Sequence, residues 1–217
     1  MRKALTLIEL ILSMVIIGIV FTVIPRLVMS MNQSTQVTIK EEAMYNAMAQ
    51  MGMILNLPWD NNNTQNPQIL SVNAGNAAYD CNLTTGYRIG GFVGGRNCIA
   101  PPGISYNAGP IQKEDAESND IDDFHDTNIT ADKNCSATLK KGLYTIGTTV
   151  IYVDDPASVG TAALSTVAKA PGQYSNTKYI LVRVGYGSDS QHKGCITALQ
   201  YHSFNIGNIQ INSRNWN

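Results

Sequence analysis

The side chains best suited to chemistry in this sequence are the carboxylates of one short segment. Residues 113–128 hold seven of the sixteen acidic residues in the 217-residue chain. Clustered carboxylates on a bendable loop suit Ca²⁺, and the ligands here would be Asp120, Asp122, Asp123 and Asp126. The spacing does not match the calcium loop of an EF-hand. Three interpretations therefore stay open: a solvated, flexible loop, a calcium site, and an interface with a basic partner.

The remaining polar residues predict no enzyme. The three histidines, His125, His192 and His202, are scattered, and none belongs to a pair at metal-ligand spacing. The sequence has no G-x-S-x-G nucleophile motif and no phosphate-binding loop. A formal net charge of −1 and the lack of an evident basic patch give no sign of nucleic-acid binding. Apart from the possible calcium, we expect no cofactor.

The four cysteines indicate disulfide bonding. Cys81, Cys98, Cys135 and Cys195 include no C-x-x-C pair, which disfavours a zinc ribbon or a thioredoxin-like motif. An even number fits two disulfides in an oxidising compartment. Of the three possible pairings we favour Cys81–Cys98 with Cys135–Cys195. Four free thiols in a cytosolic protein are the alternative, against which the N-terminus argues.

The N-terminal segment carries a carboxylate beside a long apolar run. Fifteen uncharged residues extend from Leu10 to Ile24, directly after Glu9. Counted from Leu5, a helix of twenty residues spans about 30 Å, the thickness of a bilayer core. A carboxylate inside such a helix costs roughly 2.5–3.5 kcal/mol at its centre and less near an end. Arg2 and Lys3 place the N-terminus in the cytoplasm, and no small-x-small cleavage site follows the run.

The order of these residues resembles the type IV prepilin signature. A basic stub and a small residue precede L-T-L-I-E-L and an uninterrupted apolar run. The resemblance implies that a dedicated peptidase cuts between Ala4 and Leu5 and methylates the new N-terminus. Glu9 is then the fifth residue of the mature chain. The family usually has Gly before the cut and Phe after it, so Ala4 and Leu5 depart from its pattern conservatively.

The resemblance also implies a role and partners for the segment. Glu9 of one subunit would pair with the N-terminal amine of a neighbouring subunit during fibre assembly, offsetting the cost of an unpaired charge in lipid. The implied partners are other pilin or pseudopilin subunits, prepilin peptidase, the inner-membrane assembly platform and membrane lipid. The implied location is the bacterial inner membrane, with one span and a periplasmic head, followed by a periplasmic or cell-surface fibre.

Hydrophobic periodicity predicts one long helix after the leader. We expect a leader at 1–4 and a helix at 5–57, with 5–24 in the membrane and 25–57 amphipathic. Pro25 predicts a kink or local melting. In the second half, one apolar stripe should pack against a core; it consists of Met44, Met48, Met51 and Leu55, widened by Ala43, Ala47 and Ile54.

Residues 58–217 predict a β-rich globular head. Strand-like runs occur at 85–94, 142–155 and 178–187, and residues 195–213 add one or two more. The run 178–187 is apolar on both faces, so we expect it in the centre of the sheet. Turn-rich segments separate the runs and favour antiparallel pairing. A long N-terminal helix on an antiparallel sheet is an α+β architecture, and it is that of the type IV pilin fold.

Two functions from different classes remain open. One is a structural subunit, a minor pilin or pseudopilin of a type IV pilus or a type II secretion-type fibre. The other is a membrane-anchored periplasmic binding protein or enzyme with an uncleaved anchor. The motif around Glu9 and the absence of a flexible linker after the apolar run favour the structural subunit. The sequence does not distinguish pilus, secretion and competence systems.

Overall fold

The computed structural model describes residues 6–65, 69–79, 107–113, 118–126, 144–157, 163–186 and 195–207. The chain divides into two compact units, Met1–Glu42 and Ala43–Asn217. Within the described residues, the regular structure consists of a long α-helix, a three-stranded sheet and three short helical segments. This is the α+β, pilin-like architecture that the sequence predicted.

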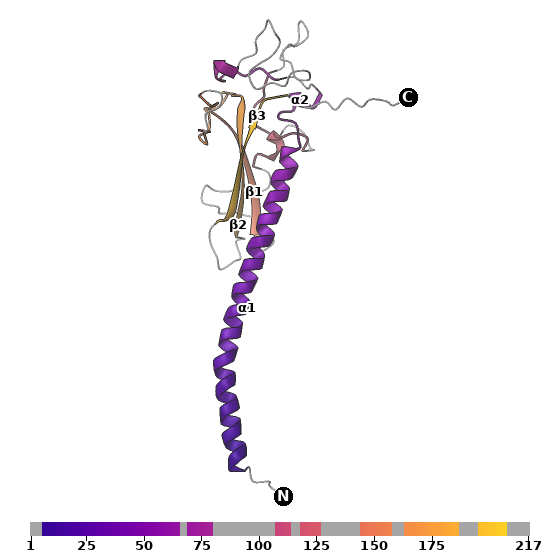
Figure 1. Ribbon diagram of the computed structural model, residues 1–217. Helices are drawn as coiled ribbons and strands as arrows, with labels where there is room; N and C mark the ends of the chain where they lie inside the picture. The colour runs from indigo at the N-terminus through magenta and orange to yellow at the C-terminus, as the bar shows by residue number, and fades with distance from the viewer. Residues whose placement is uncertain are drawn as a thin grey trace, which may run out of the picture. The chain divides into compact units, whose positions relative to one another are not determined.

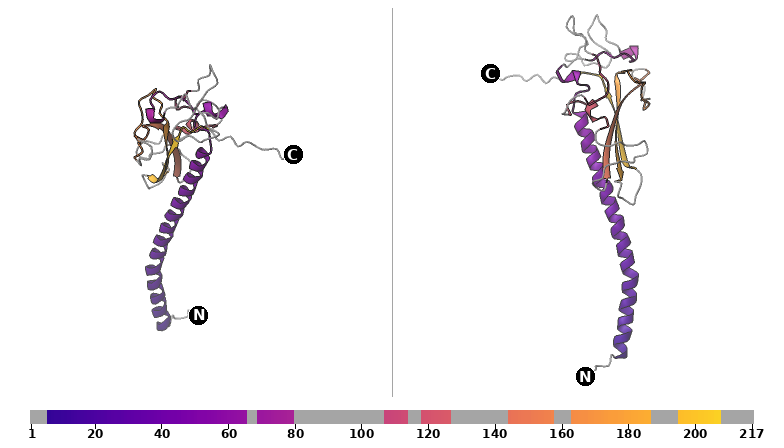
Figure 2. Two further views of the ribbon diagram at one scale, coloured as in Figure 1. Left: turned by 45° about the horizontal axis from the view of Figure 1, so that its top comes forward. Right: turned by 180° about the vertical axis from the view of Figure 1, so that it is seen from behind.

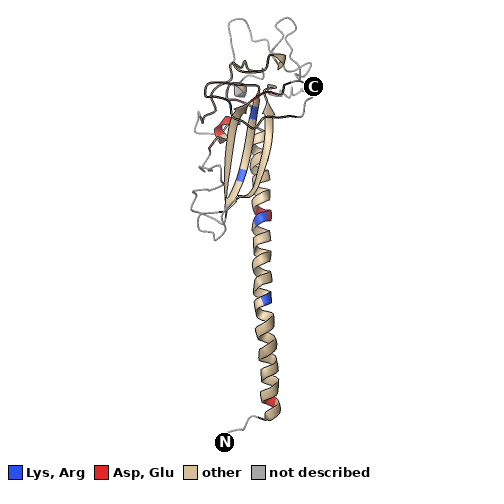
Figure 3. Cartoon of the chain, turned by 90° about the vertical axis from the view of Figure 1, so that its left-hand side faces the viewer, with Lys and Arg blue, Asp and Glu red and all other residues tan. Residues whose placement is uncertain are grey.

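The long helix α1 spans Leu7–Leu55 (Figure 1). It is long and apolar enough to cross a membrane, and no residue of its most apolar stretch is buried against the rest of the chain. Residues 10–25 carry no charge, and Figure 3 shows this stretch uniformly uncharged. Of the kink or local melting predicted at Pro25, the local melting is wrong, because α1 continues through this residue, and the kink stays a prediction. A proline removes one backbone donor, and the remaining hydrogen bonds maintain the helix.

In the second unit, the end of α1 contributes a narrow face to the core. Ala43, Ala47, Met51 and Ile54 are buried, whereas Met44 and Met48 are 42% and 45% exposed. Leu55 is 39% exposed as well, so three of the four residues of the predicted stripe are exposed, and the buried face consists of Met51 and the three residues predicted to widen the stripe. The buried face consists of two small alanine side chains together with Met51 and Ile54, all of which belong to the hydrophobic core cluster.

The sheet consists of β1 (Tyr144–Val153), β2 (Thr177–Tyr186) and β3 (Cys195–Phe204). Its order is β1-β2-β3 and both pairings are antiparallel, with an irregularity at Val184/Gly185 opposite β3. The two views of Figure 2 show the three strands as one twisted layer. The predicted strands at 142–155 and 178–187 and the central place of the latter are confirmed. The predicted strand at 85–94 lies outside the described residues.

The inner face of the sheet meets the helix end in one hydrophobic core. Ile180, Val182 and Val184 of β2 are completely buried, as their alternation predicted. They share a core cluster with Val150 of β1 and with the buried face of α1. This packing fixes the positions of the loops that follow α1.

Short elements connect the helix to the sheet. Asn56 donates its side-chain amide to the carbonyl of Gly52 at 2.6 Å near the end of α1. Beyond it lie α2 (Asn62–Gln65) and two 3₁₀ turns, η1 (Ala77–Tyr79) and η2 (Asp122–Phe124). Asn205, just after β3, accepts from the N–H of Leu70 at 3.1 Å and donates to its carbonyl at 2.8 Å. This amide ties the loop after α2 to the end of the sheet.

Candidate functional site

Glu9 lies in the first turn of α1, at one end of an exposed apolar surface. Its backbone N–H donates to the carbonyl of Thr6 at 3.0 Å, and its side chain is exposed. The apolar side chains around and beyond it are also exposed, among them Leu7, Ile8, Leu10, Ile11, Leu12, Met14, Val15, Ile16 and Ile17. An apolar surface of this extent marks a membrane or protein contact. The predicted cleavage residues Ala4 and Leu5 lie outside the described residues.

This arrangement places one carboxylate, that of Glu9, in an otherwise apolar surface of α1. An acidic side chain in the first turn is compatible with the positive end of the helix dipole. The dipole does not replace a counter-ion once the helix is surrounded by lipid. The residues from Leu10 to Pro25 supply no cationic side chain to Glu9.

The second unit contains a buried ion pair that the sequence analysis missed. Lys178 stands on β2 on the same face as Ile180 and Val182, and it is completely buried. Its Nζ donates to the carbonyl oxygen of Trp59 and to Oδ2 of Asp122, both at 2.7 Å. Oδ2 of Asp60 lies 3.6 Å from the same nitrogen. One cation thus meets oxygens from the loop after α1 and from η2.

Aromatic rings enclose the Lys178 ammonium group. Its Nζ lies 3.9 Å from the ring centroid of Trp59 and 5.1 Å from that of Tyr152. The two rings meet edge to face at a centroid distance of 5.9 Å. The Tyr152 hydroxyl donates to the carbonyl of Gly109 at 2.9 Å. The rings attract the cation and exclude water from it.

The centre of the acidic segment is buried. Asp120, Asp122 and Asp123 are each at most 3% exposed, so a solvated loop is the wrong interpretation for residues 120–124, whereas Ser118 and Asp126 are exposed. Oδ2 of Asp123 accepts from the N–H of Asn119 at 2.8 Å and from that of Asp120 at 3.3 Å. Oδ1 of Asp120 accepts from the N–H of Asp123 at 3.1 Å. These bonds shape the turn that carries Asp122 to Lys178.

Burial changes the protonation of these carboxyl groups. Desolvation raises the pKa of Asp122 to about 8, although the charge of Lys178 and its hydrogen bond act in the opposite direction. Desolvation likewise raises the pKa of Asp120 to about 6, against a backbone hydrogen bond from Asp123. The pKa of the Tyr152 hydroxyl is raised by burial and then by the neighbouring carboxylates. The two carboxyl groups and the Tyr152 hydroxyl therefore keep their protons to a higher pH than the same groups on a solvated surface.

The calcium hypothesis for Asp120, Asp122, Asp123 and Asp126 stays a prediction. No group of three or more His, Cys, Asp or Glu in the described residues is arranged to hold a metal ion. Oδ2 of Asp122 is bonded to Lys178, and Asp126 is exposed with a positive φ of 52°. Calorimetry of the full chain with Ca²⁺ tests it: binding heat and a raised melting temperature would support a site.

Of the four cysteines, Cys195 lies among the described residues. It begins β3 and is disulfide-bonded. Cys81, Cys98 and Cys135 lie outside the described residues, so the pairings Cys81–Cys98 and Cys135–Cys195 stay predictions.

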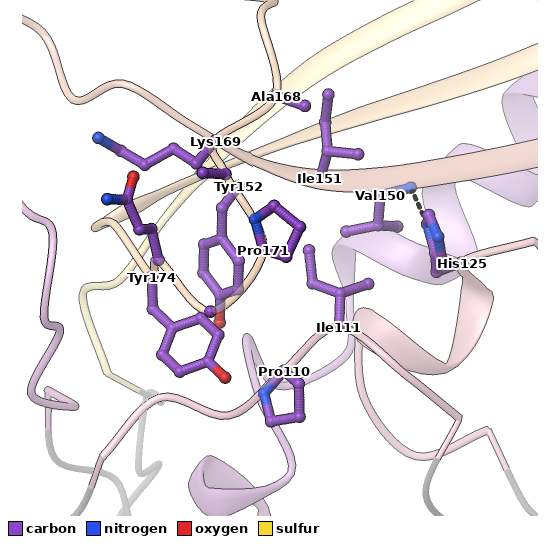
Figure 4. Close-up of a pocket in the computed structure, with 13 residues that line it drawn as sticks. Pro110, Ile111, His125, Val150, Ile151, Tyr152, Ala168, Lys169, Pro171 and Tyr174 are labelled. Atoms are coloured by element: carbon purple, nitrogen blue, oxygen red, sulfur yellow. Dashed lines mark hydrogen bonds between the residues drawn. The ribbon is translucent and has the colours of Figure 1, made fainter.

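A pocket of about 360 Å³ lies beside the edge of β1 (Figure 4). Two of its polar side chains, those of His125 and Lys169, already have partners in the fold. His125 Nδ1 accepts from the N–H of Val150 at 3.2 Å, and Lys169 Nζ contacts Oδ1 of Asp154 at 2.6 Å. The remaining wall is largely apolar and includes Pro110, Ile111 and Pro171. The pocket brings together no nucleophile and base.

One sequence signal could have revealed the buried ion pair. Lys178 falls on the apolar face of the strand predicted to be central, a position where a lysine needs a counter-ion. The apolar Ile121 and Phe124 among the acidic residues likewise indicate that their segment packs inward. Both residues are buried in the structure.

Comparison with known proteins identifies one motif. Residues 1–25 match the family profile of the prokaryotic N-terminal methylation motif. This match is consistent with a type IV pilin-like prepilin. Searches of curated proteins and of solved structures found no match to the chain.

Proposed function

Because residues 1–25 carry the prokaryotic N-terminal methylation motif, we propose that this chain is a processed structural subunit of a pilus-like fibre. The observation that carries the proposal is the position of Glu9 within that motif, at the start of an exposed apolar helix. Families with this motif are structural, and a pilin-like family implies assembly with other pilin subunits. The subunit is a minor pilin or a pseudopilin of a type IV pilus or type II secretion-type system.

Processing precedes assembly in this proposal. A prepilin peptidase cuts between Ala4 and Leu5 and methylates the Leu5 amine, while the apolar part of α1 holds the chain in the inner membrane. The head is then on the periplasmic side, as Arg2 and Lys3 predict. The cut itself creates the cation that Glu9 needs.

Assembly follows from the electrostatics of the apolar segment. In lipid, the Glu9 carboxylate of an incoming subunit is unfavourable without a partner. In a fibre, the N-terminal amine of a neighbouring subunit provides that partner, while the exposed apolar side chains of α1 pack on other helices. When the subunit moves from the membrane into the fibre at the assembly platform, its α1 thus exchanges contacts with lipid for contacts with other helices. The Glu9 carboxylate gains a cationic partner in the same step.

Variants of Glu9 test the proposal. Glu9→Val and Glu9→Gln should insert into the membrane normally but should not assemble. They should therefore be missing from fibres sheared off the cells and from pull-downs of assembled subunits. Glu41→Gln removes a charge from the same helix outside the apolar run, so it serves as the control and should assemble normally. Incorporation of Glu9→Val at the parent level would contradict the role assigned to the carboxylate. Cleavage and membrane content are measured in the same cells.

A further inference from the structure

We propose that Lys178 and Asp122 react with each other to form an amide bond, an internal cross-link between β2 and η2. The nucleophile and the electrophile are already in contact, because Nζ of Lys178 lies 2.7 Å from Oδ2 of Asp122. Their side chains are 0% and 5% exposed. The contact joins segments 56 residues apart, so folding of the head is what brings them together.

The surroundings of Asp122 favour the neutral, reactive form of its carboxyl group. A neutral amine attacks a carboxylic acid, whereas an ammonium ion and a carboxylate do not react. Burial without water disfavours the charged pair, and desolvation raises the pKa of Asp122 to about 8. Oδ1 of Asp122 has no hydrogen-bond partner among the described residues, although it is buried. A neutral carboxyl group tolerates that position better than a carboxylate does.

Asp60 is placed to move the proton. Its Oδ2 lies 3.6 Å from Nζ of Lys178. Its carboxylate accepts from the backbone N–H of Asn62 and of Gly109, each at 3.0 Å, which fixes its orientation. A carboxylate held beside the amine can act first as base and then as acid.

The reaction balances without an oxidant or a cofactor. The lone pair of Nζ forms a bond to Cγ of Asp122, and Asp60 accepts a proton from Nζ. Asp60 then returns this proton to Oδ2, the Cγ–Oδ2 bond breaks, and one water molecule leaves. The carbonyl oxygen of Trp59, 2.7 Å from Nζ, is in place to accept the N–H of the new amide.

The aromatic rings distinguish this pair from an ordinary surface ion pair. Trp59 and Tyr152 lie 3.9 Å and 5.1 Å from Nζ and shield it from water, which would otherwise stabilise the ions. Lys169 and Asp154 are the internal control, since their contact of 2.6 Å is equally close. The Asp154 side chain is 68% exposed, so that pair remains in contact with water. The cross-link does not depend on the proposed function; in a fibre subunit it would hold η2 on the sheet under tension.

Tryptic peptide mapping of the full chain, extracted from membranes in mild detergent, tests the proposal. Trypsin does not cut after a modified lysine, so residues 114–133 and 170–183 should appear as one branched peptide. Its mass should be lower than the sum of the two by one water, about 18 Da. Cleavage after Lys169 should be complete. Recovery of 114–133 and 170–178 only as separate, unmodified peptides would overturn the proposal.

An Asp60→Asn variant tests the proton-transfer step. It keeps the size of the side chain but removes the base, so the cross-linked fraction of freshly made protein should fall by about tenfold or more. Unchanged cross-linking in this variant would overturn the role of Asp60. Asp126→Asn changes an exposed carboxylate next to the same turn and should cross-link like the parent.

Discussion

Replacing Ile54 by alanine should destabilise the head strongly, because this side chain joins the end of α1 to the sheet. Ile54 is completely buried in the core cluster. The substitution removes about three methylene equivalents, worth about 2.4 kcal/mol. The cavity that remains raises the expected loss to about 3 kcal/mol. Met53→Ala is the matched control, since Met53 is 56% exposed on the same helix turn, and we expect a change within about 0.5 kcal/mol.

The assay is urea unfolding of the full chain in mild detergent under non-reducing conditions. Fluorescence of Trp59, which is 5% exposed, reports loss of the core, and a Trp216→Phe background removes the second tryptophan. With a denaturant slope of about 2 kcal/mol per molar, a loss of 3 kcal/mol lowers the midpoint by about 1.5 M. Equal midpoints for Ile54→Ala and Met53→Ala would refute the assignment of the buried helix face.

Two further perturbations address the buried carboxyl group and a close backbone approach. The raised pKa of Asp120, about 6, means that the folded head holds a proton that the unfolded chain releases; this contribution to stability is present below pH 4 and is lost as the pH rises through 6. Between pH 4 and pH 7, the free energy of unfolding of Asp120→Asn, measured with urea, should therefore rise by roughly 2 kcal/mol relative to that of the parent. The free energy of unfolding of Asp126→Asn should follow that of the parent. Parallel pH profiles for all three proteins would contradict the burial of this charge. Gly75→Ala would place a methyl group 2.6 Å from both Asn176 Nδ2 and Val72 Cγ2, so the same assay should show a loss of about 1–3 kcal/mol. Gly52→Ala, which meets nothing within 4 Å in the interior of α1, should instead be neutral or stabilising by up to about 1 kcal/mol, and equal effects at the two glycines would count against the described turn.

The sequence analysis correctly predicted a central strand and the long helix, because each is recognised from a pattern within one segment. The apolar residues on both faces of the run 178–187 identified a central strand, and the apolar run after Glu9 identified the long helix. The strand is recognised from the apolar residues on its two faces, and the helix from the length of its apolar run. Their assignment requires no knowledge of a distant partner.

The features that the sequence analysis missed depend on contacts between distant segments. A cluster of acidic residues is typical of a solvated loop, and Asp122 is buried only because Lys178 meets it from a strand 56 residues later. The predicted stripe included Ala43 and Ala47 but was centred on Met44 and Met48, which are exposed. Hydrophobicity alone ranks methionine above alanine for a buried position and so placed the centre of the stripe one position away from the packed face.

The most direct measurement of the central claim is the mass of the mature N-terminus, purified from membranes of a host that has prepilin peptidase. The account predicts a tryptic peptide from Leu5 to Arg26 whose N-terminus carries one added methyl group, about 14 Da. The matched control is a host strain without the peptidase, in which the leader should remain. An intact leader, residues 1–4, in the peptidase-containing host would contradict the account and favour a protein held by an uncleaved anchor.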